Sequence, residues 1–99
     1  MDGFSIKTAV YKESTLVSIC DEELMGRTVT EGRLKMHISR EFFYGEIVDG
    51  REALRLMKVC SMVNLAGRRT VNLAIANELG AKEAVREIEK VPFLMIYKF

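Results

Sequence analysis

The sequence predicts an α+β fold of two layers, in which a small, mostly antiparallel sheet of about four strands carries about three helices on one face. Two observations predict it. The first half of the chain holds short β-rich runs, and apolar residues recur at helical spacing after residue 50. A chain of 99 residues with 48% hydrophobic residues is enough for one core, so residues 1–99 are expected to form a single domain.

Short β-rich runs dominate the first 40 residues. FSIKTAVYK at 4–12 and TLVSIC at 15–20 are separated by two polar residues, which predicts an antiparallel hairpin. DEELMG at 21–26 begins with acids and ends with glycine, which is typical of one short helical turn. RLKMHI at 33–38 alternates apolar and polar residues and predicts a half-buried strand.

Two further segments flank the helical part of the chain. SREFFYGEIVDG at 39–50 predicts a loop, and its aromatic run at 42–44 favours a lid over the edge of the core. Aromatic side chains also stack on exposed bases, but the glutamates on both sides of this run would repel phosphates. The apolar run FLMIYKF at 93–99 predicts a closing strand inside the sheet.

Three amphipathic helices are predicted between these segments. Asp49 and Glu52 resemble a capping box at the start of the first helix. Gly80 is expected as a left-handed cap of the second helix, and Pro92 is expected to end the third. The three apolar stripes are Ala53, Leu56, Met57, Cys60 and Val63; Val71, Ala74, Ile75 and Leu79; and Ala81, Ala84, Val85 and Ile88.

The tetrad VNLA occurs twice, at 63–66 and at 71–74. Its period is too short for a structural repeat, which spans about 20–50 residues. We interpret the two copies as parts of adjacent helices separated by Gly67. Arg68 and Arg69 would then begin the second helix against its dipole, which favours a bound anion at this junction.

Composition excludes several classes of protein. No apolar run approaches the ~20 residues needed to span a bilayer, and the N-terminus lacks the layout of a signal peptide. We therefore expect a cytoplasmic protein without a membrane partner. Cys20 and Cys60 lack the paired spacing of a zinc or redox motif, and both are expected to be buried and reduced. No cofactor and no metal are expected.

Several motifs resemble those of an uncharacterised archaeal family, domain of unknown function 424. They are CDEELMG, EFFYG, NLAG and VP, in this order along nearly the whole chain. The resemblance implies an archaeal cytosolic source and no named activity. Members often carry an acid where this chain has Arg68 and a histidine where it has Phe93. The matching motif positions are Cys20, Asp21, Glu23, Leu24, Gly26, Phe43, Tyr44, Gly45, Asn64, Gly67 and Pro92.

Basic residues are concentrated in the middle of the chain. Residues 51–69 carry five basic residues and one acidic residue, whereas residues 20–49 carry four basic and seven acidic residues. A solvated helix face explains such a stripe, but the same residues are also candidates for binding an anion or the phosphates of a nucleic acid. These candidate residues are Arg51, Arg55, Lys58, Arg68 and Arg69.

Two other features give weaker signals. Asp21, Glu22 and Glu23 carry oxygen ligands for a cation, but consecutive acids diverge around a helical turn, so capping explains them better. His37 belongs to the polar face of its predicted strand and is expected to be exposed. No sequence motif of a catalytic nucleophile is present.

These observations favour a small non-enzymatic binding module whose partner is RNA or a ribonucleoprotein, bound through the basic helix face. An alternative is a protein-interaction or homo-oligomerisation domain, in which the acidic region 20–49 meets the basic helix of a partner or of a second copy. A third hypothesis is a small enzyme with a site near the Asn64–Gly67 junction and Cys20.

Overall fold

Residues 3–98 are the part of the chain that the computed structural model describes, and they hold eight strands and three α-helices. The strands are β1 (Phe4–Tyr11), β2 (Ser14–Asp21), β3 (Thr28–Glu31), β4 (Leu34–His37), β5 (Glu46–Val48), β6 (Met62–Ala66), β7 (Arg86–Ile88) and β8 (Val91–Tyr97). The helices are α1 (Arg40–Phe43), α2 (Gly50–Val59) and α3 (Arg68–Ala76), with 3-10 turns η1 (Glu22–Leu24) and η2 (Lys82–Ala84).

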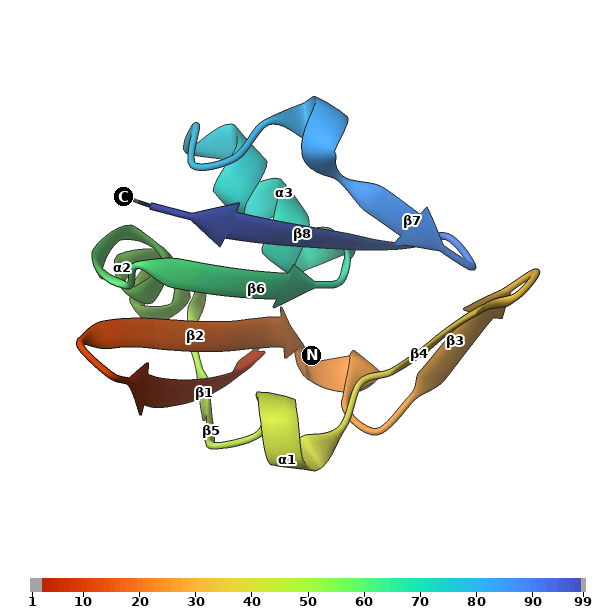
Figure 1. Ribbon diagram of the computed structural model, residues 1–99, viewed down its shortest axis with the longest axis horizontal. Helices are drawn as coiled ribbons and strands as arrows, with labels where there is room; N and C mark the ends of the chain where they lie inside the picture. Colours follow the sequence, from red (N-terminus) through yellow and green to blue (C-terminus); the bar gives the residue numbers. More distant parts are fainter. Residues whose placement is uncertain (1–2, 99) are drawn as a thin grey trace.

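The α+β prediction is confirmed, but the sheet is larger than predicted. Six strands pair in the order β5-β1-β2-β6-β8-β7, and β3 and β4 form a separate ribbon (Figure 1). Only the β2–β6 pair is parallel; the other pairs are antiparallel. The estimate of four strands missed β5, β6 and β7, and the strand predicted at 33–38 is β4 of the separate ribbon. The edge strands β5 and β7 have three residues each and carry no alternating pattern, and β6 was predicted as part of a helix.

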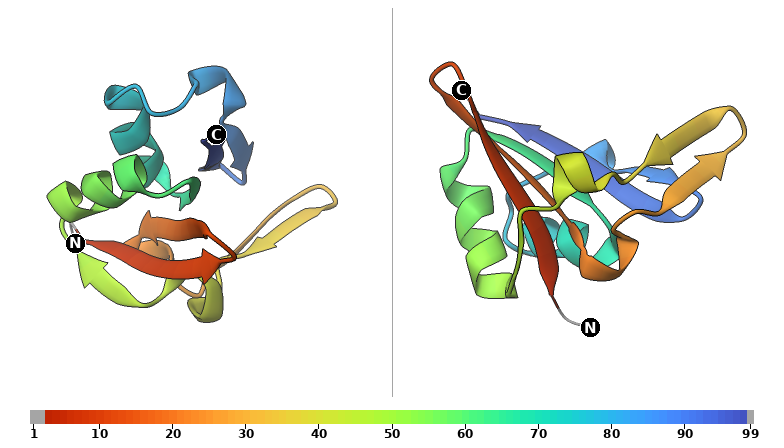
Figure 2. Two further views of the ribbon diagram at one scale, coloured as in Figure 1. Left: turned by 60° about the vertical axis from the view of Figure 1, so that its left-hand side comes forward. Right: turned by 90° about the horizontal axis from the view of Figure 1, so that it is seen from below.

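Helices α2 and α3 cover one face of the six-stranded sheet, and the short helix α1 lies on the other side (Figure 2). The main core lies between the sheet and the two longer helices, and Val17, Ile19, Val63 and Leu65 point into it from the central strands. A smaller core lies under α1, where Phe43 packs near Cys20, Leu24, Ile38 and Ala66. The predicted helices that form, α2 and α3, share one face as expected, whereas α1 lies in a segment that was predicted as a loop.

The two VNLA tetrads adopt different structures, so their interpretation as two helices is wrong. The first lies in β6 and the second in α3, and Gly67 separates a strand from a helix. Helix α2 ends at Val59, before the predicted end of its apolar stripe. Val63 and Leu65 are buried while Met62 and Asn64 are partly exposed, which is the alternation of a strand.

The predicted third helix is also wrong. Residues 82–84 form η2 and residues 86–88 form β7. Pro92 ends no helix; it lies in β8 opposite Glu87. Helix α3 already ends at Ala76, and Glu78 rather than Gly80 has a positive φ, of 59°. The three-residue spacing that predicted the helix occurs here in a turn followed by an edge strand.

Other local predictions were partly correct. The first hairpin is β1–β2, and DEELMG contains the single turn η1. The side chain of Asp49 accepts a 2.9 Å hydrogen bond from the amide of Glu52, as a cap of α2. Residues 39–50 hold α1 and β5 instead of a plain loop. Strand β4 is exposed on both sides rather than half-buried, and only Ile38 beyond its end is buried.

The closing strand β8 is confirmed between β6 and β7, although Phe99 of the predicted run lies outside the described residues. Lys98 follows β8, and its ammonium group donates hydrogen bonds to the carbonyls of Met57 and Lys58 at the end of α2. This contact explains how α2 ends without a glycine, since a cation at a helix C-terminus satisfies free carbonyls.

Candidate functional site

The junction before α3 carries its own anion. Gly67 has no side chain to cap the helix, and Asp21 from the end of β2 takes this role. Its carboxylate accepts hydrogen bonds from the amide of Arg69 at 3.1 Å, the amide of Thr70 at 2.8 Å and the hydroxyl of Thr70 at 2.7 Å. Asp21 is buried, so a carboxylate of the same chain occupies the free amides of this helix start.

Gly67 is required for this approach. Its φ of 108° and ψ of 154° lie in a region that L side chains rarely adopt. A Cβ atom at this position would lie 2.6 Å from Oδ2 of Asp21. The amide of Gly67 donates to the carbonyl of Pro92 at 2.9 Å, which ties the junction to β8.

The side chain of Arg69, whose amide donates to Asp21, is held by several partners. Its guanidinium donates to Glu23 at 2.5 Å and to the Gly3 carbonyl at 3.0 Å, and its Cζ lies 5.0 Å from the centre of the Phe4 ring. The hydrogen bond from Arg69 lowers the pKa of Glu23 below its usual value. Two motifs that are distant in sequence, CDEELMG and NLAG, therefore meet in a structural joint.

Most motif positions that match the family have a packing role. Cys20, Leu24 and Phe43 lie in the smaller core, and the amide of Gly45 donates to the Ile6 carbonyl at 2.6 Å. Gly26 has a φ of 84°, and its amide donates to the carbonyl of Ile38. Burial, together with the charges of Asp21 and Glu23, raises the pKa of the Cys20 thiol to about 12. A buried thiol that stays protonated is a poor nucleophile, which argues against the enzyme hypothesis at this junction.

The predicted basic residues lie on two helices, and three of them have partners within the chain. Arg55 pairs with Glu52 at 2.6 Å on the surface of α2. Arg68 donates to the Lys90 carbonyl at 2.9 Å, and Arg69 pairs with Glu23. No ion pair is formed by Arg51 or Lys58 within residues 3–98, and both side chains are exposed. The stripe on α2 therefore holds two cations without a carboxylate partner.

The remaining motif and signal residues lie at the surface. Tyr44 is exposed, and its ring lies 5.2 Å from the guanidinium carbon of Arg40. His37 is exposed as predicted, and its Nδ1 lies 2.8 Å from the hydroxyl of Thr28. Among residues 3–98, no group of three or more His, Cys, Asp or Glu side chains is arranged to hold a metal ion.

The face of the sheet opposite α2 and α3 is covered only in part, and we call it the open face. Strand pairing arranges its side chains in rows across β1, β2, β6 and β8. One row is Ala9, Leu16, Met62 and Tyr97, and the next is Lys7, Ser18, Asn64 and Met95. A third row runs from Ser5 through Cys20, Ala66 and Phe93 to Arg86, and α1 covers its first part.

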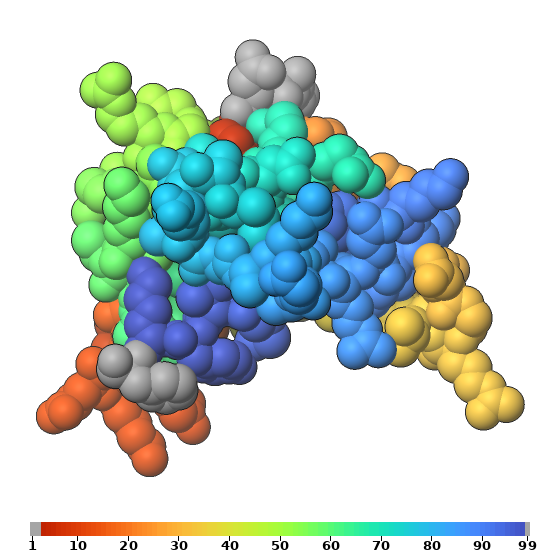
Figure 3. All heavy atoms as spheres, turned by 90° about the horizontal axis from the view of Figure 1, so that it is seen from above, coloured from red at the N-terminus to blue at the C-terminus, as the bar shows by residue number. Residues whose placement is uncertain are grey.

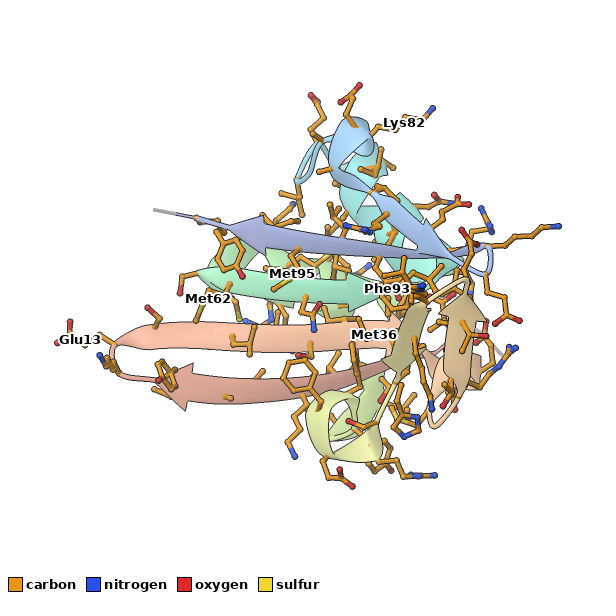
Figure 4. The ribbon with its side chains drawn as sticks, turned by 45° about the vertical axis from the view of Figure 1, so that its right-hand side comes forward. Glu13, Met36, Met62, Lys82, Phe93 and Met95 are labelled. Atoms are coloured by element: carbon orange, nitrogen blue, oxygen red, sulfur yellow. The ribbon has the colours of Figure 1, made fainter. Side chains whose placement is uncertain are left out.

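Sequence reasoning missed this surface because residues 60–66 were interpreted as helix. Exposed apolar side chains lie along it, and Met95 and Tyr97 are 55% and 54% exposed. Figure 4 shows Met62 and Met95 on the same side of the sheet, with Met36 of β4 beside Phe93. The tip of the β1–β2 hairpin and the β3–β4 ribbon project at opposite ends of the molecule, with β8 between them (Figure 3).

One end of the open face holds a hollow of about 290 Å³ between the sheet and the ribbon. Its wall is mainly apolar, and Met36, Phe93 and Met95 contribute to it. Asn64 and Arg86 are the polar residues of the lining. Reciprocal hydrogen bonds hold the ribbon in place, because Glu89 accepts from the Thr30 amide and its own amide donates to Glu31.

Together these features describe a small α+β domain in which one sheet face is packed by helices and the other is accessible. A family model described as "Protein of unknown function (DUF424)" matches residues 9–99, so the chain belongs to this family. The fold is similar to that of an uncharacterized conserved protein from the archaeon Methanopyrus kandleri, with a TM-score of 0.81 and 18% sequence identity over 96% of this chain and 90% of that chain.

A search of curated proteins finds no match to this chain. Within residues 3–98, no helix is long and apolar enough to cross a membrane.

Proposed function

We propose that this protein is a non-enzymatic binding module for single-stranded RNA, free or within a ribonucleoprotein, and that the RNA lies on the open face. One observation carries the proposal. Within residues 3–98, no strand position on this face of the six-stranded sheet is an aspartate or glutamate, whereas Lys7 and Arg86 are basic. Tyr11, Phe93 and Tyr97 add aromatic rings, on which unpaired bases stack.

The stripe on α2 is less suited to the same ligand. It lies on the opposite side of the sheet, and Glu52 neutralises Arg55 within it. It also lacks an aromatic side chain between Gly50 and Val59. A surface with basic side chains alone can bind phosphates but cannot stack on bases. The open face has both basic and aromatic side chains, so it suits phosphates and bases together. The proposal includes a cytoplasmic location, because the protein would encounter its RNA ligand there.

Fluorescence anisotropy with a short labelled single-stranded RNA, at low and at moderate salt, tests the proposal. We expect salt-sensitive binding by the unmodified chain. Tyr97→Ala should weaken it by about 1–3 kcal/mol, the usual contribution of one stacked base. Lys7→Glu should reduce the slope of log affinity against log salt by at least ~0.7, the value for one phosphate contact on a single strand.

Arg51→Glu and Lys58→Glu on α2 are the matched charge variants, and we expect them to bind RNA as the unmodified chain does. Loss of binding in these variants, with Lys7→Glu and Tyr97→Ala unaffected, would assign the RNA to the helix surface. If no RNA binding is detected at low salt, where it should be strongest, an RNA ligand is rejected. Light scattering at low and high salt would then show whether the exposed methionines of the open face mediate self-association instead.

A further inference from the structure

Asn64 has an unusual position on the open face. It lies in β6, a central strand, directly between Ser18 of β2 and Met95 of β8. Asparagine is depleted in strands, so it weakens the local preference for the strand. Positions that break a local rule in an otherwise consistent structure are often functional.

The carboxamide of Asn64 makes no hydrogen bond with any other group in residues 3–98. Its residue is only partly exposed, and it lines the hollow at the end of the open face. Its oxygen and its NH2 group are therefore available to a ligand. An amide presents one acceptor and two donors in a single plane, which matches the edge of a nucleobase.

The walls of the hollow suit a flat ring. Phe93 lies diagonally next to Asn64 on the neighbouring strand, and Met36 reaches the same place from the ribbon (Figure 4). A ring placed against Phe93 stacks on an aromatic face, and methionine sulfur also packs favourably against aromatic rings. Arg86 is paired opposite Phe93 and lines the same hollow, where its guanidinium can meet a phosphate.

From this arrangement we infer that the hollow holds one unpaired base of the RNA, stacked on Phe93, and that Asn64 hydrogen-bonds the edge of that base. The inference rests on the proposed function, since it names the position at which RNA sequence is recognised. Asn64 is then the specificity-determining residue, while Tyr97 and Lys7 contribute to affinity for any sequence. The hollow takes a single base, so the preference applies to one position of the bound strand.

Binding of labelled oligo-A, oligo-C and oligo-U to the unmodified chain and to Asn64→Leu tests the inference. Leucine keeps the branching and the number of heavy atoms of the asparagine side chain and removes its hydrogen-bonding groups. We expect the unmodified chain to prefer one of the three oligonucleotides, and Asn64→Leu to bind that one about 5- to 150-fold more weakly, as expected for a paired base edge. Affinity for the other two should change by less than about threefold.

Asn72→Leu is the control, because Asn72 holds the same place in the second VNLA tetrad and is exposed on α3. It should leave all three affinities unchanged. If Asn64→Leu fails to fold, Asn64→Ala provides the same test, because alanine also has no side-chain hydrogen-bonding group and is smaller. Equal affinities for the three oligonucleotides, or an unchanged preference in Asn64→Leu, would overturn the inference while RNA binding on the open face stands. A chain that binds none of them contradicts the proposed function itself.

Discussion

Among the carboxylates of residues 3–98, Asp21 is the one that caps α3 from a distant strand. It is buried and accepts three hydrogen bonds from the first turn of α3. In Asp21→Ala the amide and hydroxyl of Thr70 lose their acceptor in a buried place. We expect a loss of about 2–4 kcal/mol in the free energy of unfolding, measured by urea denaturation.

Asp49→Ala is the matched control for Asp21→Ala. Asp49 caps α2 through one exposed hydrogen bond, to the amide of Glu52. Its removal should cost about 1 kcal/mol, as expected for an ordinary N-cap. Equal losses in the two variants would show that Asp21 is an ordinary cap as well.

Gly67 is the partner of Asp21 in this joint. In Gly67→Ala the new methyl group would collide with the Asp21 carboxylate, in addition to about 1–3 kcal/mol of backbone strain. We expect a loss larger than this strain alone, or no folding, measured by circular dichroism during urea denaturation. Gly32→Ala is the control, because Gly32 also has a positive φ, of 62°, with open space around it. A Gly67→Ala variant as stable as Gly32→Ala would contradict the close approach.

The buried thiol of Cys20 should make the stability of the fold depend on pH. Its pKa in the folded chain is raised to about 12, above ~8.5 in an unfolded chain, so the folded state binds the thiol proton more tightly. Stability from this site is complete below pH ~8.5 and is lost as pH rises towards the folded value. The difference in unfolding free energy between the unmodified chain and Cys20→Ala should shrink by up to ~1.4 kcal/mol per pH unit in that range. A pH-independent difference would mean that the thiol ionises equally in both states.

At the scale of elements, the sequence predicted those whose signal is local. The β1–β2 hairpin, η1, the cap of α2 by Asp49 and the strand β8 all follow from short patterns. VNLA shows where local patterns are insufficient, since identical residues form a strand in β6 and a helix in α3. The first copy lies between β2 and β8, whose backbone groups pair with it, and the second follows the cap by Asp21. Non-local partners decide the structure in both cases.

The end of α2 depends on such a distant partner. The ammonium group of Lys98 donates to the carbonyls of Met57 and Lys58. We expect Lys98→Met, which keeps most of the side-chain volume, to lower the unfolding free energy by about 0.5–1 kcal/mol through loss of this interaction. Thermal unfolding measures the loss. Lys82→Met, at an exposed position of η2, is the control, and an equal effect of both would dismiss a specific role of Lys98.

At the scale of the molecule, the candidate site was only partly predictable. The summed charge indicated a basic middle segment. Two of its five basic side chains are bound by groups that are distant in sequence: Arg69 pairs with Glu23, and Arg68 donates to the Lys90 carbonyl. The open face has no continuous signal, because its side chains come from every second residue of strands scattered from β1 to β8. Only the strand order reveals that Lys7, Asn64 and Met95 share a row.

The same architecture predicts how stability is distributed over the chain. Strands β2 and β6 have paired neighbours on both sides and contribute to the main core. The β3–β4 ribbon has only one buried residue, Val29, and Glu89 and Glu31 join it to the β7–β8 turn. Hydrogen exchange measured by mass spectrometry should therefore be slowest in β2 and β6 and fastest in the ribbon.

Glu89→Gln should raise exchange in the ribbon and leave β2 and β6 unchanged, because it weakens the acceptor for the Thr30 amide without touching the core. Glu83→Gln, at an exposed position of η2, is the matched control and should change neither. Since Met36 reaches the hollow from β4, opening of the ribbon would also open the hollow to a ligand. A ribbon that exchanges as slowly as β2 would mean that the hollow is fixed and opens only with the whole fold.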